Sequence, residues 1–281
     1  ILLGLVGSEM CIRDSVFITH KLHEILEIAD RVSVLRQGRV VGTGQPDSFS
    51  EADLAEMMVG RPVSFSVERS AARTGDAVLR LNDVTLVDRT LESSLTAIDL
   101  TVREGEVVGI AGVQGNGQTE LVEVITGLAT ASSGSIEFSG ADITRASVRA
   151  RHSLGIAHIP EDRHKSGMVS AFTVAENIVL NSYYDSSVTN GVQIDWQRVR
   201  NRAARACVNY DVRTPSVQLA AGSLSGGNQQ KMVVARELER DVKLIVASQP
   251  TRGVDVGSIE YIHKQLIACR DGGNAVLIIS S

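Results

Sequence analysis

A glycine-rich segment constrains the fold more than any other part of this chain. The segment G-V-Q-G-N-G-Q-T, residues 112–119, follows the apolar run V-V-G-I-A and precedes the amphipathic run T-E-L-V-E-V-I-T-G-L. The first run is typical of a buried strand and the second of a helix. Glycines let successive backbone N–H groups turn toward one point, and the N-terminus of a helix favours a bound anion. The segment therefore predicts a phosphate-binding loop between a strand and a helix.

The spacing within this loop fits a phosphate-loop pattern at all but one position. The pattern G-x-x-x-x-G-K-[ST] is met by Gly112, Gly117 and Thr119, whereas Gln118 stands where the lysine is expected. A glycine-rich turn that binds nothing is the alternative interpretation. The motif alone favours the phosphate site and leaves the alternative open.

A dinucleotide-binding loop is a second functional interpretation of the same glycines. Gly115 and Gly117 fit the start of G-x-G-x-x-G, and Glu137 lies at about the 20-residue separation expected for an acidic residue that binds a ribose. Glu120, however, occupies the third glycine position, where close helix packing leaves no room for a side chain. We therefore rank a nicotinamide-dependent oxidoreductase below a triphosphate-binding protein.

Apolar runs alternate with helical patterns through the last two thirds of the chain. The strand candidates are residues 78–81, 107–112, 155–160, 243–248 and 275–280. Strands that alternate with helices predict an α/β fold with a mostly parallel sheet covered by helices.

Composition narrows the class of protein further. The chain has 281 residues, of which 43% are hydrophobic and 22% charged, values typical of a chain with a packed core. A net charge of −5 and an aromatic content of 4% argue against a nucleic-acid partner. Its three cysteines are widely spaced, which excludes a disulfide scaffold and a zinc ribbon and fits a reducing compartment. No apolar stretch is long enough to span a bilayer.

Four segments differ in character along the chain. Residues 1–15 resemble a non-native segment, and we exclude them from fold prediction. Residues 16–64 carry strand and helix patterns, residues 65–77 are polar and without periodicity, and residues 78–281 contain the alternating pattern. We interpret these as the C-terminal tail of one domain, a linker, and a second domain that is truncated at its C-terminus.

The tail segment has its own local signals. We expect a short buried strand at 16–19, a helix at 21–30, two strands around the turn at 36–39, and a helix that begins after Ser50 and ends at Gly60. The final residues L-I-I-S-S align with V-F-I-T-H at 16–20, so the two domains are predicted to be related.

A second glycine motif makes the prediction specific. The segment L-S-G-G-N-Q-Q-K, residues 224–231, opens a long helical pattern and creates a second anion site at a helix N-terminus. An N-cap serine followed by flexible glycines is the bland alternative. The segment resembles the signature motif of ATP-binding-cassette (ABC) ATPases, and its N-Q-Q ending is similar to carbohydrate-uptake importers whose ATPase subunit carries two cassettes. The resemblance implies an α/β P-loop cassette with a parallel core sheet, an antiparallel β arm and a helical subdomain.

Three further segments support this resemblance. P-T-R-G-V-D at 250–255 resembles the passage from Walker B into the D-loop, with Asp255 in the D-loop. I-P-E-D-R at 159–163 resembles the Q-loop region, with Glu161 in place of glutamine. T-H-K-L resembles the H-loop of the first cassette, with His20 as its switch histidine.

The resemblance implies ATP and Mg²⁺ as cofactors and assigns residues to them. Thr119 is the candidate for contact with Mg²⁺. The residues assigned to the nucleotide are Gly112, Gln114, Gly115, Asn116, Gly117, Gln118, Thr119 and Glu161, with Ser225, Gly226, Gly227, Asn228 and Gln229 from the signature motif.

Four catalytic positions of the second cassette depart from the family pattern. Gln118 replaces the P-loop lysine, Ser248 the Mg²⁺-supporting aspartate and Gln249 the general-base glutamate; by the internal alignment, Ser281 replaces the switch histidine. Each change removes a charge or a proton acceptor, which weakens nucleotide binding and slows phosphoryl transfer. The resemblance therefore implies a degenerate site that holds ATP but hydrolyses it poorly. The intact signature motif is expected to complete the site of a partner cassette.

The resemblance also implies a biological role and partners. The loop, with the segment A-S-Q-P-T-R-G-V-D-V-G-S-I-E-Y-I-H, looks most like importers of nucleosides and simple sugars. Expected partners are membrane permease subunits, a substrate-binding lipoprotein indirectly, and the first cassette of the same chain or a second copy, with no nucleic acid. The expected location is peripheral, at the cytoplasmic side of the plasma membrane. A soluble cassette protein of translation or DNA repair is the alternative within the family.

Two surface predictions complete the sequence analysis. Tyr183 and Trp196 are candidates for contact with membrane subunits, although core packing is the favoured role for each. His152, His158 and the run at 161–165, which includes His164, are predicted to be solvated surface.

Overall fold

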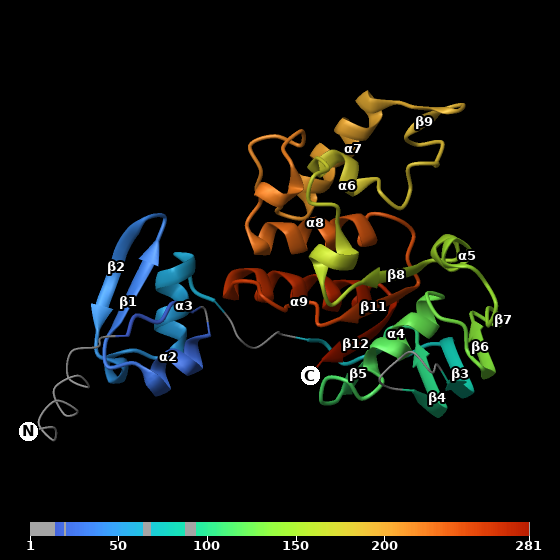
Figure 1. Ribbon diagram of the computed structural model, residues 1–281, viewed down its shortest axis with the longest axis horizontal. Coiled ribbons are helices and arrows are strands. Elements are labelled where there is room, and N and C mark those ends of the chain that lie inside the picture. Colours follow the sequence, from blue (N-terminus) through green and yellow to red (C-terminus); the bar gives the residue numbers. More distant parts are fainter. Residues whose placement is uncertain (1–14, 20, 64–68, 88–93, 281) are drawn as a thin grey trace, which may run out of the picture. The chain divides into compact units, whose positions relative to one another are not determined.

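The computed structural model describes residues 15–19, 21–63, 69–87 and 94–280, and the chain divides into two compact units, Ile1–Phe65 and Ser66–Ser281. Figure 1 shows the elements of each unit.

The first unit contains a hairpin and two short helices. The hairpin of β1 and β2 turns at Gln37 and Gly38, which both have a positive φ, as a tight turn between antiparallel strands requires. The helix after Ser50 is confirmed, and a capping box of Ser50 and Asp53 begins it. The bounds are α2 Leu22–Ile28, β1 Val32–Arg36, β2 Arg39–Gly44, the 3₁₀ helix η1 Pro46–Ser48 and α3 Glu51–Val59.

The predicted strand at 16–19 is wrong. These residues have no regular structure, and Val16 and Ile18 are 89% and 92% exposed. A buried parallel strand forms only beside neighbouring strands, and in the described part of this unit β1 and β2 pair with each other alone.

A parallel sheet forms the centre of the second unit, in the order β5–β12–β11–β8. All five residues of β11 are buried, and successive side chains enter opposite cores. Leu244 and Val246 pack on the side of α4, whereas Ile245 and Ala247 pack on the side of α8 and α9. The bounds are β5 Val107–Ala111, α4 Gln118–Thr126, β8 Ile156–Ile159, α8 Gly226–Leu238, β11 Leu244–Ser248, α9 Val256–Asp271 and β12 Ala275–Ser280.

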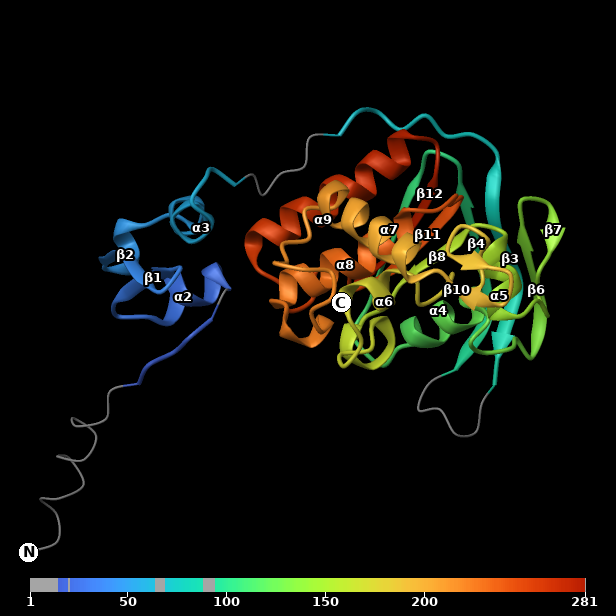
Figure 2. The same ribbon diagram turned by 90° about the horizontal axis from the view of Figure 1, so that it is seen from above.

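An antiparallel sheet covers α4 on its other side, in the order β4–β3–β6–β7. Figure 2 shows this sheet on one side of the parallel strands and α8 with α9 on the other. Phe138, Leu79 and Ile136 of this sheet share a core with Ile125 of α4. The bounds are β3 Ala77–Leu86, β4 Leu95–Arg103, β6 Ser133–Phe138, β7 Ala141–Asp142 and α5 Val148–Ser153.

A third cluster of buried side chains forms the helical part of the unit. It joins α6 and α7 to one face of α8. Tyr183 and Trp196 lie here but are 52% and 46% exposed, so core packing is the wrong role for both. The remaining bounds are η2 Arg163–Gly167, α6 Val174–Ile178, β9 Thr189–Asn190, β10 Gln193–Ile194, α7 Trp196–Asn209 and η3 Ala221–Ser223.

The α/β fold class predicted from the sequence is thus confirmed, with a parallel sheet, an antiparallel sheet and a helical part. Within the described residues, no helix is both long and apolar enough to cross a bilayer.

Candidate functional site

The glycine-rich loop connects β5 to α4, as the sequence predicts (Figure 1). Gly115 and Gly117 have φ values of 89° and 94°, a conformation that side chains other than glycine rarely adopt. Gly117 is the N-cap of α4, and the N–H of Gly112 donates to the carbonyl of Ser280 at the end of β12 at 3.3 Å. The loop is therefore fixed between two strands and a helix N-terminus, which is a suitable position for an anion.

The Gln118 side chain folds back across the loop that precedes it. Its Nε2 donates to the carbonyl oxygen of Val113 at 2.8 Å, and its Oε1 accepts from the backbone N–H of Asn116 at 3.1 Å. A Cβ atom on Gly112 would lie 2.5 Å from this Nε2, so glycine at this position leaves room for the carboxamide.

A small hollow opens beside the loop, at the carboxyl ends of the parallel strands. Crevices at this edge of an open α/β sheet are the usual place for ligands. It is lined by Gln114, Gly115, Gln118, Thr119, Glu161, Ser248, Gln249 and Ile279. Four separate parts of the sequence meet here, and all but the last of these residues were predicted to belong to one site.

Carboxamides dominate the polar lining of this hollow, and Glu161, the one carboxylate among its described lining residues, is already paired. Glu161 forms a short ion pair with Arg252, and Gln114 Nε2 lies 3.5 Å from the same carboxylate oxygen. Mg²⁺ is bound through oxygen ligands that usually include a free carboxylate. The hydroxyl of Thr119 and the carboxamide oxygens of this hollow therefore fit a magnesium ion poorly.

The two positions aligned with Walker B lie at the end of β11. Ser248 is its last residue and is buried. Gln249 follows with φ 46°, in the left-handed region, and its N–H donates to the carbonyl of Ile279 at 2.8 Å. A carboxamide at Gln249 accepts no proton near neutral pH, so this position provides no general base.

The signature segment forms the N-terminus of α8. Ser225 is the exposed N-cap, and its Oγ accepts from Asn228 Nδ2 at 3.0 Å. Gly226 is half-buried, whereas Gly227 is buried where an added Cβ would collide with Asp255 and Ser258. Among the described residues that line the hollow, none comes from this segment. The structure therefore separates the signature residues from the loop of the same cassette.

Arg163 ties the signature helix to the rest of the unit. Its Nε donates to Gln229 Oε1 at 3.1 Å, and its two terminal nitrogens donate to the carbonyls of Arg252 and Gly253 at 3.0 and 3.3 Å. Neither Arg163 nor Arg252 was predicted as a site residue, because their partners lie far away along the chain and no local pattern marks them.

The prediction of solvated surface for this region is wrong in part. Arg163 is half-buried, and so is His158, whose pKa is lowered by its burial. His152 is also half-buried, whereas His164 is exposed.

Three further predicted positions have separate outcomes. Asp255 is the N-cap of α9, and its carboxylate accepts from the N–H and the hydroxyl of Ser258, both at 2.9 Å. His20 and Ser281 lie outside the described residues.

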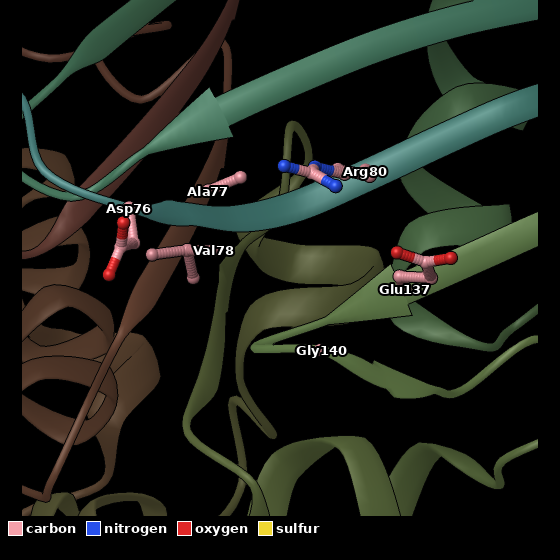
Figure 3. A pocket seen from close by; sticks show the side chains of 6 residues that line it. All are labelled: Asp76, Ala77, Val78, Arg80, Glu137 and Gly140. Carbon is pink, nitrogen blue, oxygen red and sulfur yellow. The ribbon is translucent and has the colours of Figure 1, made fainter.

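A second hollow lies on the antiparallel sheet, away from the loop (Figure 3). It is lined by Asp76, Ala77, Val78, Arg80, Glu137 and Gly140. Glu137, the acidic residue of the dinucleotide interpretation, pairs with Arg80 across β6 and β3. A dinucleotide fold needs this residue at the end of a parallel strand next to the loop, so the geometry argues against that interpretation.

Comparisons with known proteins agree with this architecture. The chain is 46% identical over 265 residues to the nucleoside import ATP-binding protein NupA of Lactococcus lactis, covering 94% of this chain and 52% of the relative. It is 45% identical to the guanosine import ATP-binding protein NupO of Bacillus subtilis, covering 90% and 50%, and 46% identical to the glucose import ATP-binding protein TsgD13 of Haloferax volcanii, covering 94% and 48%. The chain thus spans about half the length of these curated relatives.

A solved structure has the same fold, and a family profile identifies the family. The structure of MJ0796, a bacterial ABC transporter cassette, superposes with a TM-score of 0.60 at 22% identity, covering 72% of this chain and 87% of that one. The family profile described as ABC transporter matches residues 95–252, and the chain therefore belongs to the ABC transporter family of ATP-binding cassettes.

Proposed function

We propose that this chain is part of the ATP-binding subunit of an importer for nucleosides or simple sugars. The names of the curated relatives support this role. The subunit would lie at the cytoplasmic face of the plasma membrane, bound to permease subunits and served indirectly by a substrate-binding lipoprotein. The first cassette of the same chain, or a second copy, would face the signature segment.

The cassette described here would bind ATP through backbone N–H groups of the loop and hydrolyse it slowly. The observation that carries this proposal is the lining of the hollow, where Gln118, Ser248 and Gln249 meet beside Thr119. Because none of these side chains is charged, the hollow neutralises little phosphate charge. Loss of a general base alone reduces a rate by about 10²–10⁴.

The signature segment would complete the nucleotide site of the partner cassette. The exposure of Ser225 and the half-burial of Gly226 leave the N-terminus of α8 accessible to a facing module. The two cassettes together would therefore have one hydrolytic site, in the partner cassette, and one degenerate site, in this cassette.

The first experiment tests nucleotide binding by this chain. We expect ATP to raise the melting temperature, since a ligand at about ten times its Kd adds roughly 1.4 kcal/mol to the free energy of unfolding. NAD at the same concentration should have no effect. Stabilisation by NAD and not by ATP would favour the oxidoreductase and end the proposal.

The second experiment tests the degenerate site in a protein that joins this chain to a first cassette. The first cassette carries an inactivating substitution, so that only the site of this cassette is measured. We expect ATPase activity near background, and an increase when Gln118→Lys, Ser248→Asp and Gln249→Glu are combined. The same three positions changed to alanine serve as the control. Equal rates before and after the repair would contradict a degenerate site.

The third experiment tests the shared site in the same two-cassette protein. Ser225→Asp keeps an N-cap residue and places a negative side chain at the exposed end of α8, so we expect the ATPase rate of the first cassette to fall by at least an order of magnitude. Ser223→Ala, an exposed position just before the motif, is the matched control. An unchanged rate in Ser225→Asp would exclude the shared site.

Co-purification separates transport from the alternative within the family. An importer subunit should be recovered with permease subunits when both are expressed together in membranes. A chain recovered with ribosomes or DNA instead would favour the soluble cassette protein.

A further inference from the structure

Gln118 contacts the loop in a way that a lysine cannot. A lysine ammonium only donates hydrogen bonds, whereas a carboxamide donates and accepts. Gln118 uses both functions within its own loop, with Nε2 on the Val113 carbonyl at 2.8 Å and Oε1 on the Asn116 N–H at 3.1 Å. The carboxamide therefore bridges two backbone groups that are three positions apart.

The bridge uses a group that a phosphate would need. A phosphate-binding loop holds its ligand through backbone N–H groups that point inward. The Asn116 N–H is engaged by Gln118 Oε1 in this chain. The absence of a Cβ on Gly112 lets the carboxamide come close to the backbone on the other side of the loop.

We propose that Gln118 is an internal ligand of the loop, which occupies the place of a phosphate oxygen and competes with the nucleotide for the Asn116 N–H. This inference rests on the proposed function, because it assumes that the loop binds phosphate. This role is opposite to that of a side chain that binds phosphate in place of lysine, only more weakly. Gln118 holds the loop in shape without nucleotide and lowers the affinity of the loop for the triphosphate.

The two roles predict opposite effects of the same substitution. If Gln118 were a weak phosphate ligand, its removal would weaken ATP binding. If it is a competitor, Gln118→Ala frees the Asn116 N–H, which ATP must otherwise take from the carboxamide, and the Kd for ATP should fall by about tenfold.

The binding experiment measures the Kd of ATP by calorimetry for the 281-residue chain and its variants. Gln118→Ala should bind more tightly than the unchanged chain. Gln118→Glu keeps an oxygen for the Asn116 N–H, but it loses the donor to the Val113 carbonyl and adds a charge that repels phosphate, so it should bind ATP more weakly. Gln114→Ala is the matched control, because it removes another carboxamide of the same hollow whose contact to Glu161 is long, at 3.5 Å. Its affinity should not rise.

A second measurement follows the bridge without any nucleotide. In chain labelled with ¹⁵N-asparagine, the Asn116 amide hydrogen should exchange slowly with solvent, and at least tenfold faster in Gln118→Ala. In Gln118→Glu the amide should stay protected, which also shows that a substitution at this position is compatible with folding.

The outcomes are distinguishable. The internal ligand would be overturned if the Asn116 amide exchanged equally fast in the unchanged chain and in Gln118→Ala. It would also be overturned if the Kd of Gln118→Ala for ATP were equal to or higher than that of the unchanged chain. Either result would leave nucleotide binding intact. Failure of every variant to bind ATP would instead overturn the proposed function, and the competition with it.

Discussion

Single side chains decide the chemistry at the edge of the parallel sheet. Glu161 follows β8, and Arg252 and Gln114 contact its carboxylate within the described residues. The carboxylate that stands in place of the family's glutamine is therefore held by the protein itself. Arg163, two residues later, holds the signature helix through Gln229. A pattern of residue types could point to the positions of the site, but it could not identify these pairs, since an ion pair depends on contacts between distant segments.

The first prediction at this scale concerns His158. Burial holds its pKa below 6.5, with a further lowering by Arg236, while Glu237 acts in the opposite direction. The unfolded chain therefore binds more protons than the folded chain below about pH 6.5, and stability is lost as the pH falls from there toward the folded pKa. We expect the loss of unfolding free energy between pH 7 and pH 5 to be smaller in His158→Gln than in the unchanged chain. Denaturant titrations at both pH values measure it, and the exposed His164→Gln should behave like the unchanged chain.

The second prediction concerns Gly227. A methyl group there would overlap Asp255 and Ser258 and disturb the hydrogen bonds that begin α9. Gly227→Ala should therefore lower the free energy of unfolding by about 1–3 kcal/mol. Gly109→Ala, whose Cβ would meet no neighbouring atom, is the control for the loss of glycine itself. Equal stability of the two variants would show that the helices move apart without cost.

Elements were predictable from the sequence where their signals are local. The turn at Gln37 and Gly38, the helix that Ser50 caps and the strand–loop–helix around Gly117 all depend on neighbouring residues, and all are present. The strands β4 and β6 were not among the strand candidates; only the family resemblance implied an antiparallel part. The alternation of apolar and polar residues from Ile98 to Arg103 in β4 is a strand signal that was overlooked, whereas β6 begins with small polar residues. Their pairing with β3 is a long-range property that no local pattern specifies.

A prediction at the scale of elements concerns Arg151, which is 1% exposed. Its guanidinium donates to the carbonyls of Val124 and Ile125 at the end of α4, at 2.5 and 2.8 Å, and to those of three residues between β6 and α5: Ile143, Thr144 and Ala146. Arg151→Met leaves these buried acceptors without donors, so we expect a loss of about 3–5 kcal/mol in the free energy of unfolding.

Two companion variants sharpen this test. Arg151→Lys keeps the charge but lacks the planar guanidinium, so its free energy of unfolding should lie between those of the unchanged chain and Arg151→Met. The exposed Arg145→Met should change stability by less than about 0.5 kcal/mol. A small effect of Arg151→Met would mean that water replaces the guanidinium at the end of α4.

At the scale of the whole molecule, the chain consists of two units with separate buried side chains. Leu54 and Ala55 are buried in the first unit, and three large clusters lie in the second. We expect calorimetry to resolve two transitions, because units with separate cores unfold separately and a small unit is the less stable one.

Leu54→Ala should abolish the transition of the first unit or lower its midpoint temperature, and leave the other transition unchanged, since removing a buried leucine costs about 2–5 kcal/mol. Leu79→Ala, at a buried position of the antiparallel sheet, should lower only the second. A single transition that shifts in both variants would show that the units unfold as one.

The order of strands in the parallel sheet has a consequence for synthesis. β5 precedes the glycine loop and pairs with β12, a strand that comes much later in the sequence. The N–H of Gly112 also donates to the carbonyl of Ser280 at the end of β12. A ribosome therefore releases the loop long before the strand that fixes it. Contacts between such distant segments form slowly. Until β12 has been synthesised, β5 therefore lacks the strand that it pairs with in the folded cassette.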